Sequence, residues 1–360
     1  MASVGVVPAA FGQHPPAPSP EPSPDPSAEA ESSGPRLTIR GFTNVDFAVH
    51  ENRLPRTFSM GQFDLFLTSA LSEDWSFLAE VNFEFGDDNQ LVVDVERAQL
   101  RYAPMDAFSI AVGRMHTPLG YWNQTFHHGA WFQTTASRPE MYLFEDEGGI
   151  LPVHEVGLQA AGTLNGRALA FKYSVSLVNG RGRIPDEVTN VQDRNGGKAV
   201  NILLAIAPTA VKGLEVGMDT WLDHIPADPD VPGREGEIRE RILGGYVTFH
   251  RSHAELLAEI SHVHHRDEVT GGEFGTWGLY AQGSWKLGRW RPYYRFDQVD
   301  VAYGDPFLDP FLDPKDLSRH TLGLRFDPMP WVGLKGEYHL TRPRGEEGVH
   351  SARFQAAFTF

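Results

Sequence analysis

Hydrophobic and polar residues alternate along most of this chain, in blocks of about ten residues. In the block from Trp75 to Phe85, aromatic or small apolar residues occupy every second position, and Ser, Asn or Glu occupy most positions between them. A period of two is that of a β-strand, whose successive side chains point to opposite faces. Ten residues is also about the length that a tilted strand needs to cross a bilayer. The pattern therefore predicts strands of membrane-spanning length.

Sixteen segments show this alternation, and the connections between them alternate as well. Short turns follow the even-numbered segments, among them Asn165-Gly166, a strong signal for a two-residue hairpin. The segments lie near residues 37–49, 57–70, 75–85, 91–102, 108–114, 155–164, 167–177, 198–207, 213–222, 238–249, 253–264, 274–287, 290–301, 318–327, 331–341 and 350–360. Long polar loops follow the odd-numbered segments, including 115–154, 178–197, 223–237 and 302–317.

An even strand number with alternating short and long connections is typical of a closed barrel in a membrane. Every backbone N–H and C=O in lipid must be paired, so the last strand must meet the first. We therefore predict an all-β fold, a closed 16-stranded antiparallel transmembrane β-barrel with short periplasmic turns, long extracellular loops and periplasmic termini. Aromatic residues near the strand ends fit the two membrane interfaces, among them Trp75, Tyr102, Phe108, Trp285, Trp290, Trp331, Phe358 and Phe360.

Composition removes several other classes of protein. The formal net charge of −16 argues against a nucleic-acid partner, because binding phosphates needs clustered Lys and Arg. The chain has no cysteine, which excludes disulfides and thiol chemistry. No run of about 18 apolar residues occurs, so no transmembrane helix is expected.

The first 35 residues differ from the rest in composition. Residues 14–35 are rich in Pro, Ser and acidic residues and should form an extended, solvated linker. Residues 1–13 resemble the end of a secretory signal with a small-residue cleavage site near Gly12, and an ordinary disordered N-terminus is the alternative. We predict a disordered segment over 1–35 and the barrel over 36–360.

The end of the chain and the start of the longest loop carry a family resemblance. Phe354, Phe358 and Phe360 at alternating positions of the last strand look like the assembly signal of bacterial outer-membrane proteins. The sixteen-strand layout and "VGRMHTPLGYWNQTFHHGAWFQTTASRPE" resemble the phosphate-selective porin O and P superfamily over roughly residues 36–360. This resemblance implies a passive channel, often a trimer, with a loop folded into the lumen. Those porins have a Lys- and Arg-rich lumen, whereas loop 115–154 has Arg138 as its one Lys or Arg.

If the apolar faces meet lipid, the opposite faces line a water-filled lumen and set its selectivity. We hypothesise that separate basic and acidic sectors of the wall create a transverse field that orients dipolar solutes; charges that merely solvate a wide lumen are the alternative. The basic candidates are Arg40, Arg97, Arg101, Lys172, Lys286, Arg291, Arg295, Arg325, Lys335 and Arg353. The acidic candidates are Asp46, Asp64, Glu80, Glu84, Glu255, Glu259, Asp297 and Glu337.

Loop 115–154 is far longer than an ordinary connection and rich in aromatic residues, so it should be ordered and have a function. We expect it to fold inward and narrow the pore; an external lid or a trimer latch is the alternative. The residues that we expect at the constriction are His116, Tyr121, Trp122, His127, His128, Trp131 and Arg138.

Two histidine clusters and one acidic run could bind metal ions, although the spacing favours none of them. His116 with His127-His128, and His262 with His264-His265, offer imidazoles without a carboxylate or thiol at fixed spacing. The run at 305–316 places Asp305, Asp309 and Asp313 four residues apart but lacks the pattern of a calcium loop. We expect loop or surface histidines, exposed Pro-Asp turns, and neither metal nor cofactor.

No catalytic motif occurs in the sequence, so we predict a channel and not an enzyme. A lipid or ester hydrolase with a triad on the barrel wall is one alternative, because triads are recognised only in space. A channel specific for anions or saccharides is another. A receptor or energised transporter would need a larger barrel with a plug. The expected partners are outer-membrane lipid, the barrel assembly machinery, two further copies in a trimer, and small hydrophilic solutes.

Overall fold

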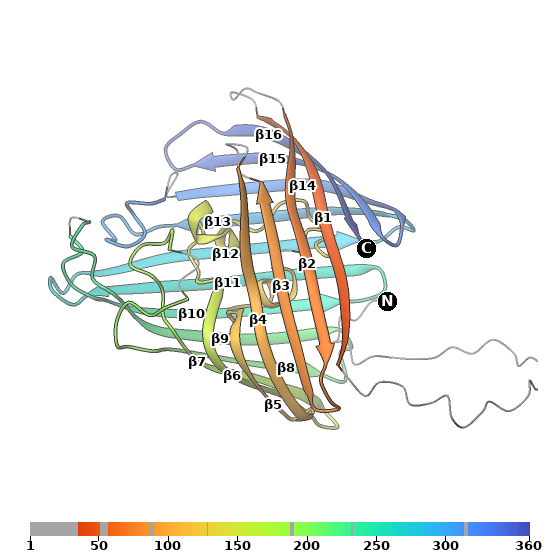
Figure 1. The fold of residues 1–360 in the computed structure, drawn as a ribbon. Coiled ribbons are helices and arrows are strands. Elements are labelled where there is room, and N and C mark those ends of the chain that lie inside the picture. The colour runs from red at the N-terminus through yellow and green to blue at the C-terminus, as the bar shows by residue number, and fades with distance from the viewer. Residues whose placement is uncertain are drawn as a thin grey trace, which may run out of the picture.

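The protein folds into one closed, antiparallel β-barrel of sixteen strands in the computed structural model (Figure 1). The structure describes residues 35–50, 57–85, 90–127, 129–187, 191–231, 233–312 and 316–360. The segment predicted to be disordered, 1–35, lies outside the described residues except for Pro35. In the described part of the chain, no helix is both long enough and apolar enough to cross a membrane.

Each strand pairs with its neighbours in sequence order. The strands are β1 (Arg36–His50), β2 (Thr57–Ala70), β3 (Trp75–Phe85), β4 (Leu91–Met105), β5 (Phe108–His116), β6 (His154–Asn165), β7 (Leu169–Val178), β8 (Ala199–Pro208), β9 (Leu214–Ile225), β10 (Ile238–His250), β11 (Ala254–Asp267), β12 (Glu273–Trp285), β13 (Trp290–Asp300), β14 (Asp316–Met329), β15 (Val332–Pro343) and β16 (Val349–Thr359). The predicted fold class and strand number are confirmed, and the predicted strand ends differ from the observed ones by at most three residues.

The last strand closes the barrel, as the need for backbone pairing in lipid predicts. β16 runs antiparallel to β1 from Phe42 opposite Thr359 to His50 opposite Ser351. Gly41 and Phe360 then exchange two backbone hydrogen bonds, of 3.1 and 2.9 Å. Because the strand number is even, the start of β1 and the C-terminus lie at the same end of the barrel (Figure 1). The short turns also lie at this end, and the long loops lie at the other.

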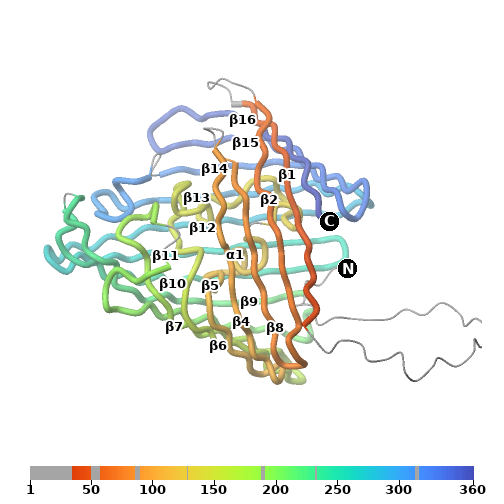
Figure 2. Tube along the Cα trace, in the orientation of Figure 1, coloured from red at the N-terminus to blue at the C-terminus, as the bar shows by residue number. Residues whose placement is uncertain are grey.

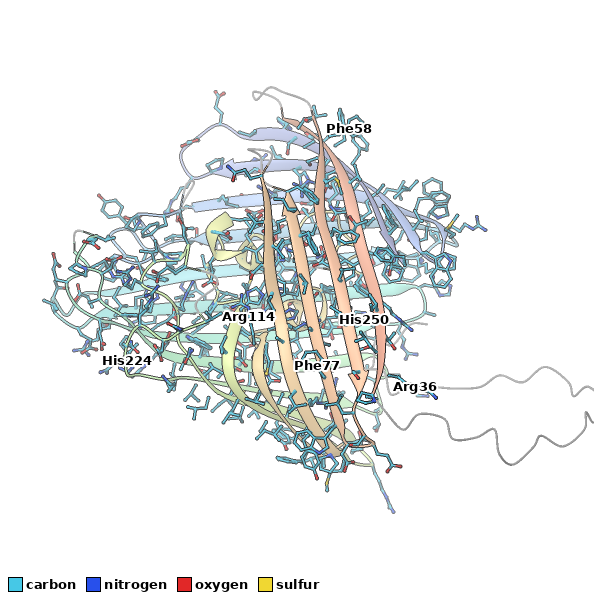
Figure 3. All side chains as sticks on the ribbon, viewed as in Figure 1. Arg36, Phe58, Phe77, Arg114, His224 and His250 are labelled. Atoms are coloured by element: carbon cyan, nitrogen blue, oxygen red, sulfur yellow. The ribbon has the colours of Figure 1, made fainter. Side chains whose placement is uncertain are left out.

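The outer surface carries the apolar half of the alternation. Phe77 on β3 is exposed although it is large and apolar (Figure 3). Leu243 on β10 and Leu322 on β14 are also exposed. Trp75, Trp285, Trp290 and Trp331 are exposed near the short turns. This pattern is that of a barrel whose outer face meets hydrocarbon, with an aromatic ring at the membrane interface.

The interior is filled to a large extent by the connection between β5 and β6. This segment, residues 117–153, is called the long loop here; it contains α1 (Trp122–Thr125), η1 (Glu140–Tyr142) and η2 (Glu145–Glu147). Figure 2 draws α1 within the ring of strands. Trp122, Met141 and Ile150 of the long loop are buried in one hydrophobic cluster with inward side chains of β9 to β13 and with residues 307–312. We expected water against these inner faces; Trp221, Ile242 and Val263 instead point inward and pack in this cluster.

Candidate functional site

The first part of the long loop is fastened to the wall through its backbone. Glu259 on β11 accepts hydrogen bonds from the backbone N–H groups of Tyr121 (2.7 Å) and Trp122 (2.8 Å). The hydroxyl groups of Tyr142 and Tyr280 donate to the same carboxylate at 2.8 and 2.5 Å. A carboxylate that accepts several hydrogen bonds is a strong anchor, since charge-assisted bonds exceed neutral ones in strength.

Glycine is needed just before this anchor. Gly120 has φ +66°, and its N–H donates to Asp219 on β9 at 3.0 Å. A Cβ atom at this position would lie 1.7 Å from the Tyr142 hydroxyl oxygen and 2.1 Å from a Glu259 carboxylate oxygen. Only glycine lets the backbone approach the wall this closely with such a φ angle.

The middle of the long loop is held by charged side chains of β14 and β15. Lys335 donates to the backbone carbonyls of Ala130 and Thr135, and Arg325 donates to those of Trp131 (2.9 Å) and Gln133 (2.6 Å). Glu337 accepts from the backbone N–H groups of Ala136 (2.7 Å) and Ser137 (3.1 Å). The wall thus supplies cations to loop carbonyls and an anion to loop N–H groups.

The next stretch of the loop meets β13 and β14. Arg295 is fully buried and donates to the carbonyls of Ser137 (2.8 Å) and Arg138 (2.7 Å). Asp297 accepts from the N–H of Glu140 at 3.2 Å, and Arg319 forms an ion pair with the Glu140 carboxylate. Burial raises the pKa of Glu140, and the opposing charge of Arg319 limits the rise.

Arg138 is half-buried, and its guanidinium bonds within the long loop. Its guanidinium donates to the carbonyls of Tyr142 (2.7 Å) and His127 (3.0 Å) and stacks on the ring of Phe144. Burial lowers the pKa of Arg138 to about 10, so the group is still cationic at neutral pH. Arg138 therefore stabilises the shape of the loop from within.

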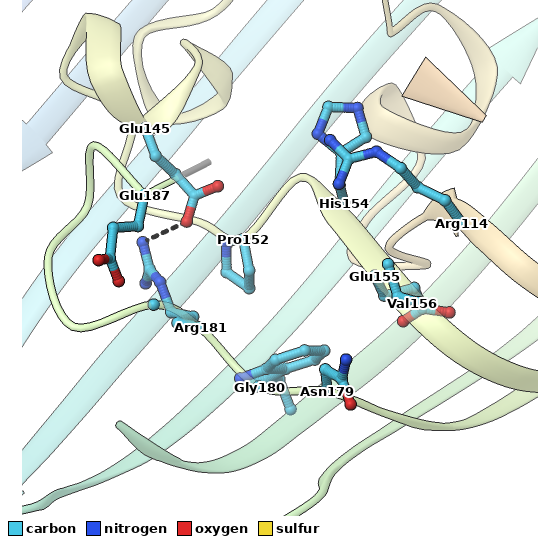
Figure 4. A pocket seen from close by; sticks show the side chains of 12 residues that line it. Arg114, Glu145, Pro152, His154, Glu155, Val156, Asn179, Gly180, Arg181 and Glu187 are labelled. Atoms are coloured by element: carbon cyan, nitrogen blue, oxygen red, sulfur yellow. Dashed lines mark ion pairs between the residues drawn. The ribbon is translucent and has the colours of Figure 1, made fainter. Parts of the chain in front are cut away.

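The last part of the long loop takes part in a buried network of ion pairs. This network lies near the end of the barrel that carries the long connections. Arg181, which follows β7, forms ion pairs with Glu145 (2.9 Å) and with Glu240 on β10 (2.8 Å). Burial raises the pKa of Glu145 to about 6, although Arg181 opposes the rise. Figure 4 shows the Arg181–Glu145 pair beside a small pocket that His154 and Arg114 line on the opposite side.

The same network reaches the 305–316 run through His265. His265 lies between Glu240 (2.9 Å) and Asp305 (2.8 Å), and Asp305 also accepts the backbone N–H groups of Phe307 and Leu308. Phe307 and Leu308 are fully buried. Our expectation of exposed Pro-Asp turns is therefore wrong for this part of the run, whereas Asp313 lies outside the described residues.

The predicted lumen residues fall into two groups. The first group bonds to the long loop or to residues that hold it: Arg291, Arg295, Arg325, Lys335, Glu255, Glu259, Asp297 and Glu337. The second group comprises the remaining wall residues: Arg40, Arg97, Arg101, Lys172, Arg353, Asp46, Asp64, Glu80 and Glu84. Among them, Arg97 pairs with Glu80, Lys172 pairs with Glu215, and Asp46 accepts a hydrogen bond from Gln355. Lys286 lies in neither group, because β12 ends at Trp285 and Lys286 is exposed in the following turn.

Several basic residues of the wall lie next to acidic residues, so the two signs of charge are not separated into different sectors. Arg295 donates to Asp297 at 2.8 Å, and Arg97 donates to Glu80 at 2.6 Å. Arg291 lies 3.6 Å from Glu255. A transverse field requires separated charges, so these pairs weaken the field that we hypothesised.

Two of the predicted loop histidines meet a third that we did not single out. The ring atoms of His116, His127 and His154 that can bind metal all lie within 4.8 Å of one another. Glu96 on β4, which we also did not select, lies 2.5 Å from His154. His128 lies outside the described residues.

The second histidine cluster is split by the barrel wall. His262 stacks on Trp277, an exposed residue of the outer face, at 4.1 Å between ring centroids, and His264 lies on the same face. His265 points to the interior and is fully buried. These three residues do not converge, because successive residues of a strand point to opposite faces.

One hydroxyl–imidazole–carboxylate chain in the described structure has the connectivity of a hydrolase triad. Thr321 Oγ1 lies 3.1 Å from His339 Nδ1, and His339 Nε2 lies 3.2 Å from Glu337. Thr321 is completely buried, however, and Glu337 already accepts the two loop N–H groups. No substrate can reach this hydroxyl in the observed arrangement, so it offers no support for a hydrolase.

The class of fold is that of the bacterial outer-membrane porins, as comparison with solved structures shows. The anion-selective porin from Comamonas acidovorans has a TM-score of 0.62 at 11% identity, with 91% of this chain and 100% of that chain covered. The outer-membrane channel DcaP of Acinetobacter baumannii has a TM-score of 0.62 at 12% identity, with 92% and 99% covered. At these identities the likeness concerns the fold.

A third similar structure is that of OmpT, an outer membrane protein of Vibrio cholerae in a trimer form. Its TM-score is 0.58 at 10% identity, with 91% of this chain and 100% of that chain covered. No protein-family model matches this chain, and no curated protein sequence matches it. The fold is thus that of porin-like barrels, and the phosphate-selective part of the predicted resemblance is not confirmed.

Proposed function

We propose that the protein is a bacterial outer-membrane porin, a channel for passive diffusion of small hydrophilic solutes or ions. In this proposal the long loop is the constriction, and the N- and C-termini face the periplasm. A closed sheet pairs all of its backbone groups, its apolar outer face can contact lipid, and its charged inner face can contact water. The names of the similar structures, an anion-selective porin and an outer-membrane channel, point in the same direction.

The observation that carries the proposal is the attachment of the long loop to the inner wall. Its backbone receives hydrogen bonds from or donates them to charged side chains of β11, β13, β14 and β15. A loop held at so many points keeps a fixed cross-section, and a fixed cross-section can select solutes by size and charge. An external lid would not be bonded to the middle of the wall.

The proposed lining of the remaining aqueous path is formed by the members of the second group that are at least partly exposed: Arg40, Arg97, Arg101, Lys172, Arg353 and Glu84. Asp46, Asp64 and Glu80 are buried. Lys172 on β7 and Glu215 on β9 form an ion pair of 2.6 Å, and the Lys172 side chain is 45% exposed. Arg101 and Arg353 are partly exposed on the same inner surface. Both signs of charge are present there, which agrees with a general porin more than with a phosphate-selective one. A homotrimer, with lipid and the assembly machinery as partners, completes the proposal.

Removing part of the long loop tests the constriction. Deletion of residues 122–134 should raise the single-channel conductance in planar bilayers, because the cross-section of an aqueous path sets its conductance. Recordings with a panel of anions, cations and neutral sugars would also give the selectivity of the wild-type protein.

The matched control is the Lys198→Gln variant, whose altered side chain lies in the loop between β7 and β8 and pairs with Asp193. This change should leave the conductance as it is. Equal conductance of the deletion variant and the wild type, with both inserted as barrels, would contradict the proposed constriction. A wild-type protein that inserts and conducts nothing would contradict the channel itself.

A further inference from the structure

The cluster of His116, His127 and His154 joins the long loop to the wall where the loop begins and ends. His116 is the last residue of β5 and His154 the first residue of β6, and the two are directly paired in register. His127 follows α1 and stacks on His116 at 3.6 Å between ring centroids. His127 Nε2 lies 2.9 Å from His154 Nε2. Three separate elements thus bring their imidazoles to one point.

The orientation of the His127 ring is fixed by Asn123. The Asn123 amide nitrogen donates to the carbonyls of Thr117 (2.8 Å) and Val153 (2.9 Å), so its oxygen must face His127 Nδ1, 2.8 Å away. An amide oxygen can only accept, and His127 Nδ1 therefore carries the proton. The lone pair of His127 is then on Nε2, which points at His154. A hydrogen bond of this kind orients the histidine ligands of metal sites.

A β-bulge brings a carboxylate to the same point. Glu80 pairs with Arg97 and Val81 pairs with Val95, so Glu96 is the extra residue of β4. The bulge turns both Glu96 and Arg97 inward, which regular alternation would not allow. Glu96 lies 2.5 Å from His154 Nε2 and 3.7 Å from His127 Nε2.

The four side chains are shielded from water. The side chains of His116, His127, His154 and Glu96 are 8% exposed or less. His127 also has φ +24°, an unusual value for a residue with a Cβ, and such backbone strain often occurs at functional positions.

We propose that His116, His127, His154 and Glu96 bind one divalent transition-metal ion, with Zn²⁺ as the best match. Three imidazoles and a carboxylate suit this ion, which is usually four-coordinate with bonds of about 2.0 to 2.2 Å to these atoms. Such bonds place ligand atoms roughly 3.3 Å apart. The histidine ligand atoms, which lie within 4.8 Å of one another, would have to approach by up to about 1.5 Å, and the 2.5 Å between Glu96 and His154 would have to lengthen. The ion would tie the long loop to β4, β5 and β6 at its base. This site is independent of the proposed channel function.

Metal binding can be measured on the untagged full-length protein in detergent, because a histidine tag would itself bind zinc. After treatment with a chelator and its removal, ZnCl₂ is titrated by calorimetry and bound zinc is counted by mass spectrometry. We expect one Zn²⁺ per chain. The His127→Ala/His154→Ala variant should lose this binding, and Asn123→Ala, which removes only the orienting amide, should weaken it about 10- to 100-fold.

The His262→Gln/His264→Gln variant is the matched control, since it removes two neighbouring histidines of the outer face. Its zinc binding should equal that of the wild type. Heat-modifiable migration in gels checks that each variant is folded. If the double alanine variant does not fold, the wild-type protein is loaded with Co²⁺ and its visible absorption spectrum is recorded. Absorption bands of four-coordinate cobalt would support the proposed site, and their absence would overturn it. The proposal would be overturned if the wild-type protein bound less than one Zn²⁺ per chain. It would also be overturned if the His262→Gln/His264→Gln variant lost as much zinc binding as the His127→Ala/His154→Ala variant. Either result would mean that the cluster is held by hydrogen bonds only.

Discussion

Glu259 illustrates how a single wall residue can decide the position of the long loop. Its carboxylate accepts two loop N–H groups and two tyrosine hydroxyls in a buried position. Glu259→Gln replaces one acceptor oxygen by a donor and leaves buried donors without a good partner, at a cost of about 3 kcal/mol. Hydrogen–deuterium exchange of a peptide covering residues 117–125 should then be roughly 100-fold faster, since 1.4 kcal/mol corresponds to a factor of ten.

Glu273 on β12 provides the comparison. Its side chain is 61% exposed and lies 3.9 Å from His264, far from the long loop's anchors. Glu273→Gln should leave exchange in residues 117–125 unchanged. Protection in Glu259→Gln equal to that of the wild type would mean that residues 117–125 are held in place without the Glu259 carboxylate.

Some residues of the histidine cluster could be selected from the sequence and others could not. His116 and His127 stood out because they lie in an unusually long loop that also contains His128. Glu96 could not be assigned to the cluster from the sequence, because regular alternation predicts that it points away from Arg97. Nothing in the local sequence indicates the bulge that turns both side chains inward. His154 was missed because its partner across the strand pair, His116, is 38 residues earlier in the chain.

At the scale of elements, the strands were predictable and the interior packing was not. Period-two alternation found all sixteen strands, because lipid outside and polar groups inside impose it on every strand. Where the long loop and residues 307–312 pack against the wall, that rule fails, and inward positions such as Trp221 and Ile242 are apolar. Alternation within a strand carries no information about which distant loop will cover it.

The turn at Gly120 gives a prediction for the loop as an element. Gly120→Ala should prevent the loop from docking at Glu259, because the new methyl group would collide with Tyr142 and Glu259. Limited proteolysis of the folded barrel with chymotrypsin should then cut after Trp122, which is fully buried in the wild type.

Gly271→Ala is the control that separates the steric collision at position 120 from the energetic cost of a positive φ angle. Gly271 has φ +72°, similar to +66° at Gly120, but a Cβ there would meet nothing within 4 Å. Its cost is therefore the left-handed conformation alone, about 1 to 2 kcal/mol. If both variants resist cleavage after Trp122, the close approach at Gly120 does not control docking.

The whole molecule depends on the seam between β1 and β16. Deletion of residues 350–360 removes β16 and leaves the edges of β1 and β15 unpaired. Each unsatisfied backbone group in hydrocarbon costs several kcal/mol, so we expect no closed barrel. The fast-migrating band of unboiled protein in detergent gels should be lost. Deletion of residues 14–34, ahead of β1, should keep it, and a fast band from the variant without β16 would contradict the role of the seam.

The way in which the long loop is bound also has a consequence for protein engineering. Between Ala130 and Ser137, the wall residues Arg325, Lys335 and Glu337 bond to carbonyl and amide groups, which every amino acid other than proline possesses. Trp131 and Phe132 are the two residues of this stretch that are not buried, so their side chains can be exchanged without touching those attachments. The barrel offers a cradle in which side chains of different chemistry at these two positions could be displayed in one backbone shape.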